Sequence, residues 1–138
     1  MLKKIAMEFK KKEIEKIFKE FVDAFNKGPE SVVSFFAEDA KIQYPYSDYP
    51  PMNRQEYFDQ LSEILPIMAP FTQYGFKLYA TDEQGTYWAT MDLECNIQTT
   101  GKVYGQHYVI RFSINIDMKI THYYEYWNPL KFIEATKL

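Results

Sequence analysis

The sequence predicts an α+β domain in which helices come first and a curved antiparallel sheet, wrapped around an aromatic-lined pocket, follows. Up to about residue 66, apolar residues recur at helical spacing, and from about residue 71 they alternate with polar residues as they do in strands. Short turns separate these strands, so consecutive strands must pair antiparallel. The 138 residues leave room for one domain, covering 1–138.

Three helices are expected before the sheet. The first carries its apolar side chains on one face, and Gly28 and Pro29 end it. Its apolar positions are Ile14, Ile17, Phe18, Phe21, Val22 and Phe25. Pro29 opens a short second helix, and residues 40–44 form a short strand. Asn53 and Glu56 form a capping box that starts the third helix, which Pro66 limits.

Four longer strands are expected at 71–80, 86–98, 103–114 and 118–127. The alternation assigns every second side chain of the strands at 86–98 and 103–114 to the inner face of the sheet. In the first of these strands they are Tyr87, Ala89, Met91, Leu93, Cys95 and Ile97. In the second they are Tyr104, Gln106, Tyr108, Ile110 and Phe112. On the last strand the even positions from Ile120 to Tyr126 are the more apolar. The opposite register would bury Lys119 and Glu125, which is costly for unpaired charges, so the even register is predicted to face inward.

The composition limits the kinds of partner, cofactor and location that we expect for the protein. Aromatic residues make up 18% of the chain and are mostly Tyr and Phe, which suits a lined cavity. A net charge of −3 gives no field to gather phosphates, so nucleic acid is not expected as a partner. The single Cys95 allows no internal disulfide, and neither a metal site nor a cofactor is expected. Lysines interrupt the first apolar residues, which predicts no signal peptide, no membrane span and a cytoplasmic location.

His122 is the candidate catalytic residue, because it is the group on the predicted inner face that titrates near neutrality. It would act as a general acid or base beside tyrosine hydroxyls. The alternative is a structural histidine bonded to a tyrosine. The predicted ligand-binding residues, which combine apolar walls with sparse polar tips, are Tyr44, Phe58, Met91, Tyr104, Gln106, Tyr108 and Tyr124.

Two passages resemble a known superfamily. Residues 36–40 (Phe-Ala-Glu-Asp-Ala), after a helix that ends Asn-Lys-Gly, resemble the entry into the first strand of the SnoaL-like, ketosteroid-isomerase-like (nuclear transport factor two-like) superfamily. Residues 125–129 (Glu-Tyr-Trp-Asn-Pro), after Gly101 and Tyr104, resemble its phenazine-biosynthesis A/B-type branch. The resemblance implies a cone-shaped fold, a deep pocket between helices and sheet, and a homodimer formed through the outer face of the sheet.

The resemblance does not extend to the residues that ketosteroid isomerases use. The position of their first tyrosine donor corresponds to Phe21, and that of their aspartate base corresponds to Tyr44. A phenol is a poor base at neutral pH, so no ketosteroid isomerase activity of the usual kind is expected.

Two functions fit the sequence. The first is a small-molecule-binding protein for a small apolar or cyclic ligand, with or without acid–base chemistry of the isomerase or cyclase type. The second is a non-catalytic ligand-binding or assembly module with a vestigial pocket, in which side chains fill the interior. A homodimer is expected in either case, because Trp88, Val109, Tyr123 and Trp127 would form an aromatic patch on the outer face.

Overall fold

The computed structural model describes the backbone of residues 2–138 and the side chains of Leu2 and of residues 10–138. Within this part of the chain there are four helices, α1 (Leu2–Ala24), α2 (Pro29–Val33), α3 (Arg54–Met68) and α4 (Pro129–Thr136). The five strands are β1 (Phe36–Gln43), β2 (Thr72–Ala80), β3 (Thr86–Asn96), β4 (Val103–Ile114) and β5 (Ile120–Tyr126).

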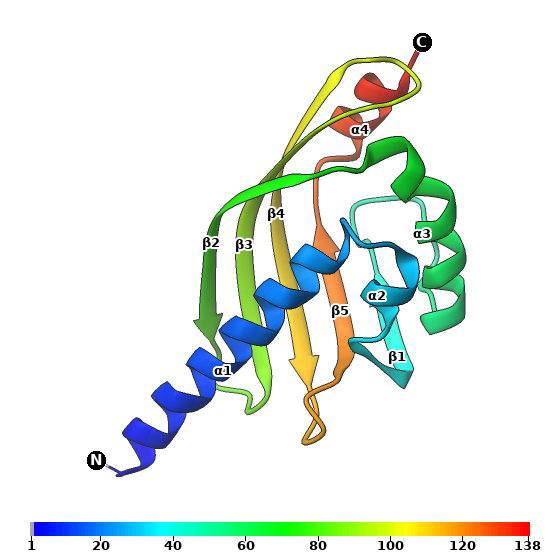
Figure 1. Cartoon of the computed structure of the whole chain (residues 1–138). Helices are drawn as coiled ribbons and strands as arrows, with labels where there is room; N and C mark the ends of the chain where they lie inside the picture. The colour runs from blue at the N-terminus through cyan, green and yellow to red at the C-terminus, as the bar shows by residue number, and fades with distance from the viewer. Residues whose placement is uncertain (1) are drawn as a thin grey trace.

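The strands form one sheet in the order β1-β5-β4-β3-β2, and the first three helices cover one face of it (Figure 1). β2, β3, β4 and β5 pair antiparallel, as predicted, whereas β1 joins the edge of β5 in parallel. The predicted α+β class is therefore confirmed, with a mixed sheet and one helix, α4, beyond the three expected.

The helices are fixed by local signals that the sequence carries. Asn53 accepts a hydrogen bond from the Glu56 amide and the Glu56 carboxylate accepts one from the Asn53 amide, which is the predicted capping box. At the end of α1, Asn26 accepts from the Phe71 amide at 2.7 Å and donates to the Phe71 carbonyl at 3.0 Å. This pair of bonds holds the end of α1 against the start of β2.

The core lies between the helices and the inner face of the sheet. The ring of Phe18 on α1 stacks on Phe112 of β4 with centroids 4.4 Å apart, and Phe21 meets Tyr123 of β5 edge-on at 5.4 Å. The inner faces predicted for β3 and β4 are buried along their whole length. The period-2 reading of these two strands is confirmed.

The predicted register of β5 is wrong beyond Ile120. Ile120 pairs with Ile114, but His122 pairs with Ser113, so Thr121 is an extra residue in a β-bulge. The bulge shifts the alternation by one residue. From there on Tyr123 and Glu125 face inward, opposite Phe112 and Ile110.

The residues on the other side of the bulge face outward. His122 and Tyr124 lie opposite Ser113 and Arg111 on the outer face, and Tyr126 packs against Trp88 there. Of the four side chains predicted to form the outer patch, Tyr123 is buried in the core and Trp127 lines an inner cavity. Tyr124 and Tyr126 take their places on the outer face.

None of the helices in the described residues is long and apolar enough to cross a membrane. α4 begins at Asn128, whose side chain accepts a hydrogen bond from the Leu130 amide, with Pro129 at the first helical position. It packs against β4 and closes one end of the space between the helices and the sheet (Figure 1).

Candidate functional site

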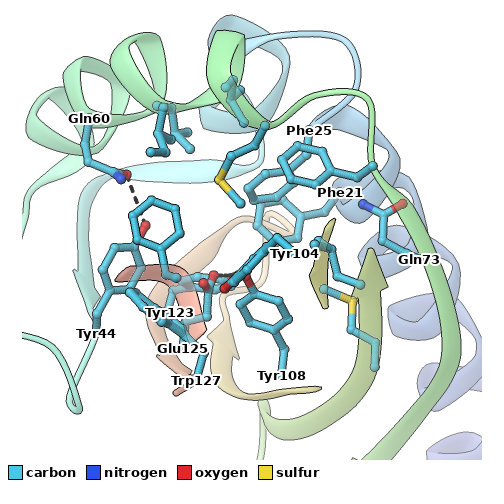
Figure 2. Close-up of a pocket in the computed structure, with 18 of the residues that line it drawn as sticks. Phe21, Phe25, Tyr44, Gln60, Gln73, Tyr104, Tyr108, Tyr123, Glu125 and Trp127 are labelled. Atoms are coloured by element: carbon cyan, nitrogen blue, oxygen red, sulfur yellow. Dashed lines mark hydrogen bonds between the residues drawn. The ribbon is translucent and has the colours of Figure 1, made fainter. Parts of the chain in front are cut away.

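A cavity of about 90 Å³ lies between the sheet, α3 and the end of α1. Figure 2 shows Glu125 and the tyrosine hydroxyls grouped on the sheet side, with Phe21 and Phe25 across from them. The lining is mainly aromatic and aliphatic, with polar groups from Tyr44, Tyr49, Gln60, Gln73, Tyr104, Tyr108, Tyr123 and Glu125.

Glu125 is the acidic group in this cavity wall. Its Oε2 accepts a hydrogen bond of 2.6 Å from the hydroxyl of Tyr123, two residues earlier on the same face of β5. Burial raises the pKa of the Glu125 carboxyl to about 7, and the Tyr123 bond offsets only part of that effect. At neutral pH this carboxyl is therefore poised between its two protonation states, which is what general acid–base chemistry requires.

The tyrosines around Glu125 stay protonated. Burial, with a further contribution from the negative charge of Glu125, raises the pKa of Tyr44, Tyr108 and Tyr123 well above the ordinary value. Tyr44 donates its proton to Oε1 of Gln60 on α3 at 3.1 Å, as the dashed line in Figure 2 shows. These hydroxyls are donors, and they have no role as bases.

Two tyrosines of β4 form a connected pair. The hydroxyls of Tyr104 and Tyr108 lie 3.2 Å apart, and Gln106 donates from Nε2 to the Tyr104 hydroxyl at 2.9 Å. Gln106 is itself fixed, because it donates to the Asn128 carbonyl and accepts from the Asn128 amide. The backbone at the start of α4 thus orients the amide that holds the tyrosine pair.

Four of the predicted ligand-binding residues line the cavity: Tyr44, Met91, Tyr104 and Tyr108. Gln106 is buried behind them and reaches the cavity only through Tyr104. Phe58 lies on the other side of α3, in a shallow groove beside Val33 and Arg54. Tyr124 is on the outer face, where Arg111 lies over its ring at 5.8 Å.

His122 does not face the cavity. It pairs with Lys41 of β1 and Ser113 of β4 on the outer face, and its Nδ1 lies 3.2 Å from the Thr121 hydroxyl. The inward orientation predicted for this histidine is wrong, because the bulge at Thr121 turns it away. Because His122 faces outward, the geometry does not support a catalytic role for it in this cavity.

Among the wall residues that sequence reasoning missed are three from β5 and the residue after it: Tyr123, Glu125 and Trp127. A signal for them was present, because alternation counted backwards from Trp127 places all three on one face. That register was rejected because it buries Glu125. The structure accommodates the burial through the bond from Tyr123 and the raised pKa of the carboxyl.

Other reactive groups add little to the site. Burial raises the pKa of the Cys95 thiol to about 11, so the thiol is not an activated nucleophile. Among the described side chains, which are those of Leu2 and of residues 10–138, no group of three or more His, Cys, Asp or Glu is placed to hold a metal ion. Asp92 contacts His107 at 3.1 Å on the outer face, away from the cavity.

No family model matches the sequence, and no curated protein matches it either. Solved structures do match. A candidate isomerase from Bacillus subtilis is 23% identical with a TM-score of 0.79, over 93% of this chain and 94% of its own. A candidate polyketide cyclase from Xanthomonas campestris pv. campestris is 19% identical with a TM-score of 0.77, over 92% of this chain and 98% of its own.

A phenazine biosynthesis-related protein from Pseudomonas aeruginosa is 20% identical, with a TM-score of 0.69 over 90% of this chain and 83% of its own. Together with a match to an NTF2-like protein, these structures confirm the resemblance at the level of the fold. The chain shares the α+β fold of these solved structures, and a cavity lies between its helices and its sheet.

Proposed function

We propose that the protein binds a small apolar or cyclic molecule in this cavity and performs acid–base chemistry of the isomerase or cyclase type on it, with Glu125 as the proton-transfer group. The observation that carries the proposal is a carboxyl with a pKa near 7 in an apolar, tyrosine-lined cavity. A carboxyl whose pKa lies near the operating pH is well matched to proton transfer, because it is a stronger base than an ordinary carboxylate and is still partly ionised.

The cavity also supplies a donor for the charge that proton abstraction creates. Tyr104 and Tyr108 have two phenolic protons between them, and their mutual hydrogen bond uses one. Gln106 donates to this pair, so it takes neither proton. Whichever hydroxyl donates to the other, one proton remains for an oxygen atom of the ligand. A developing oxyanion held there would be stabilised in a site with little water.

The names of the similar structures point the same way, since they include a candidate isomerase and a candidate cyclase. The alternative function, a binding or assembly module with a vestigial pocket, requires an interior filled by side chains. The cavity of about 90 Å³, with a carboxyl and hydroxyls in its wall, favours the first function.

The test uses 2-indanone, a small cyclic ketone with acidic protons beside its carbonyl, as a probe. Hydrogen–deuterium exchange at these positions in D₂O is followed by NMR, with and without the protein. We expect the protein to accelerate the exchange, and the rate constant to increase as the pH rises through about 7, because the ionised form of Glu125 is the base.

Glu125→Gln should abolish the acceleration, whereas Glu94→Gln, which removes an exposed carboxylate from the outer end of β3, should leave it unchanged. Acceleration that survives in Glu125→Gln would exclude Glu125 as the base. If the protein binds 2-indanone without accelerating exchange at any pH, the cavity binds small molecules without acid–base chemistry; if it neither binds 2-indanone nor accelerates exchange, the alternative of a vestigial pocket holds.

A homodimer formed through the outer face of the sheet is also part of the proposal. Tyr79, Trp88, Arg111 and Tyr124 lie side by side on neighbouring strands of this face. The ring of Tyr126 packs on Trp88 with centroids 5.9 Å apart. A second copy of the chain would cover this aromatic outer face, defined by Tyr79, Trp88, Tyr124 and Tyr126.

A further inference from the structure

The charge in the cavity wall is unbalanced. Glu125 lines the cavity, and the other described side chains that line it include no lysine, arginine or histidine. An ionised carboxylate in an apolar wall without a cationic partner is costly, which is why burial raises its pKa. The described residues that line the cavity therefore leave this charge without a counterion.

The groups that face Glu125 from each neighbouring element are phenols. They are Tyr123 on β5, Tyr104 and Tyr108 on β4, Tyr57 on α3 and Tyr44 at the end of β1. Burial raises the pKa of each of them, so all are neutral at physiological pH. Tyr123 bonds to Oε2, and the hydrogen bonds among the described residues leave Oε1 without a protein donor.

Aromatic rings surround the space next to this carboxyl. Trp127, two residues after Glu125 on the same face, packs against Tyr44 at 5.5 Å and Phe132 at 6.2 Å between centroids. Phe132, on α4, also meets Tyr104 at 5.7 Å. The faces of Trp, Tyr and Phe rings attract cations, and Trp attracts them most strongly. Aromatic walls around a single carboxylate are complementary to an organic cation.

We propose that the cavity selects ligands that carry a basic nitrogen on a small ring system, with the ammonium group paired to Glu125 Oε1 and held against the aromatic walls. This inference rests on the proposed function, because it names the class of ligand that the same cavity binds. An ammonium supplies the counterion that the described lining residues do not provide. An anionic ligand would place a second negative charge beside the ionised form of Glu125 and is disfavoured.

The test compares three probes of one shape and different charge: 2-aminoindane, 2-indanol and indane-2-carboxylate. Binding is followed by the fluorescence of Trp127 in a Trp88→Phe background, which leaves one of the two tryptophans, the one in the cavity wall. We expect 2-aminoindane to bind tightest and the carboxylate not to bind at about pH 8, where Glu125 is mostly ionised and the amine is still protonated.

The pH dependence distinguishes the charge pair from simple apolar binding. From about pH 6 to about pH 8 the ionised fraction of Glu125 rises from about a tenth to about nine tenths, so the affinity for 2-aminoindane should increase about tenfold. The affinity for neutral 2-indanol should stay level or decrease over the same range. This comparison needs no change at Glu125 and so does not depend on how a variant folds.

Glu125→Gln should remove the preference for the amine over the alcohol, and Glu94→Gln, which lowers the negative charge of the chain equally, should keep it. Tighter binding of 2-indanol than of 2-aminoindane at about pH 8 would overturn the inference while leaving the proposed function intact. If none of the three probes binds, both the inference and the proposed function lose their support.

Discussion

Glu125 is tolerated in the cavity wall because one oxygen has a donor and because the carboxyl can take up a proton. The Tyr123 bond favours the ionised form, and burial favours the protonated form more strongly. The folded state therefore binds the proton of this carboxyl more tightly than the unfolded chain does. Folding stability must then depend on pH through this residue.

Glu125 makes the folded chain less stable as the pH rises. Between about pH 4.5, the ordinary value, and about pH 7, the folded chain binds more protons at Glu125 than the unfolded chain, so stability decreases as the pH rises. A pKa raised by this much lowers the free energy of unfolding by at most about 3 kcal/mol. Solvent that reaches the open side of the cavity reduces this effect. In Glu125→Gln this contribution is absent. We expect the wild-type chain to lose stability relative to Glu125→Gln between pH 4.5 and 7, measured by urea unfolding at several pH values.

Glu94→Gln provides the control, because Glu94 is exposed at the outer end of β3. Its stability should follow that of the wild-type chain at every pH. A Glu125→Gln variant that shows the same pH dependence as wild type would mean that Glu125 titrates normally.

Tyr123 tunes Glu125 through a single hydrogen bond. Its hydroxyl stabilises the carboxylate, so Tyr123→Phe should raise the pKa of Glu125 above the wild-type value of about 7. The pH at which 2-indanone exchange accelerates should move upward by the same amount, with the ring packing against Phe21 retained. A pH–rate profile that stays at the wild-type position would show that the bond does not control the proton affinity of Glu125.

At the scale of elements, the sequence predicted most of the sheet from alternation alone. β4 was predicted at its observed bounds, and the inner faces of β3 and β4 were assigned correctly, because both strands run without a bulge through buried positions. β2 was also predicted to within one residue. Strict period-2 patterns of this length are the strongest local signal for a half-buried strand.

β5 shows where that reasoning fails. A single extra residue, Thr121, reverses the faces of the rest of the strand, and no residue type in the sequence marks the bulge. The argument against burying Glu125 then supported the wrong register. α4 was missed for a different reason. Asn128 and Pro129 are a good helix start, but the helix has only 8 residues and its apolar positions Leu130 and Ile133 are exposed.

The bulge at Thr121 leads to a prediction about a substitution at His122. Since its imidazole lies on the outer face beside Lys41 and Ser113, His122→Asn should change neither 2-indanone exchange nor 2-aminoindane binding. The effect on stability should be within about 0.5 kcal/mol, as for most partly exposed positions. Loss of binding in His122→Asn, with the melting temperature unchanged, would instead place this histidine at the cavity.

At the scale of the whole molecule, the fold separates two surfaces of the sheet. The inner face bears the cavity, and the helices α1, α2 and α3 cover it (Figure 1). The outer face has no helix packed on it among the described residues, yet it carries large aromatic side chains. Tyr79 is 49% exposed, and Trp88, Tyr124 and Tyr126 are partly exposed. Aromatic residues and arginine are typical of the central part of protein interfaces.

The predicted homodimer follows from that face. Trp88 lies between Tyr79 and Arg111 in a row across the strands, so a partner that covers this row buries Trp88 near the centre of the contact. Trp88→Glu would then place two like charges close together across a twofold axis, and we expect it to convert a dimer into a monomer in sedimentation velocity at micromolar concentration. Ile116→Glu is the matched control, because Ile116 is 98% exposed in the turn after β4, and it should leave the dimer intact.

A wild-type chain that sediments as a monomer at micromolar concentration would refute the dimer. A dimer that survives Trp88→Glu would place the interface elsewhere.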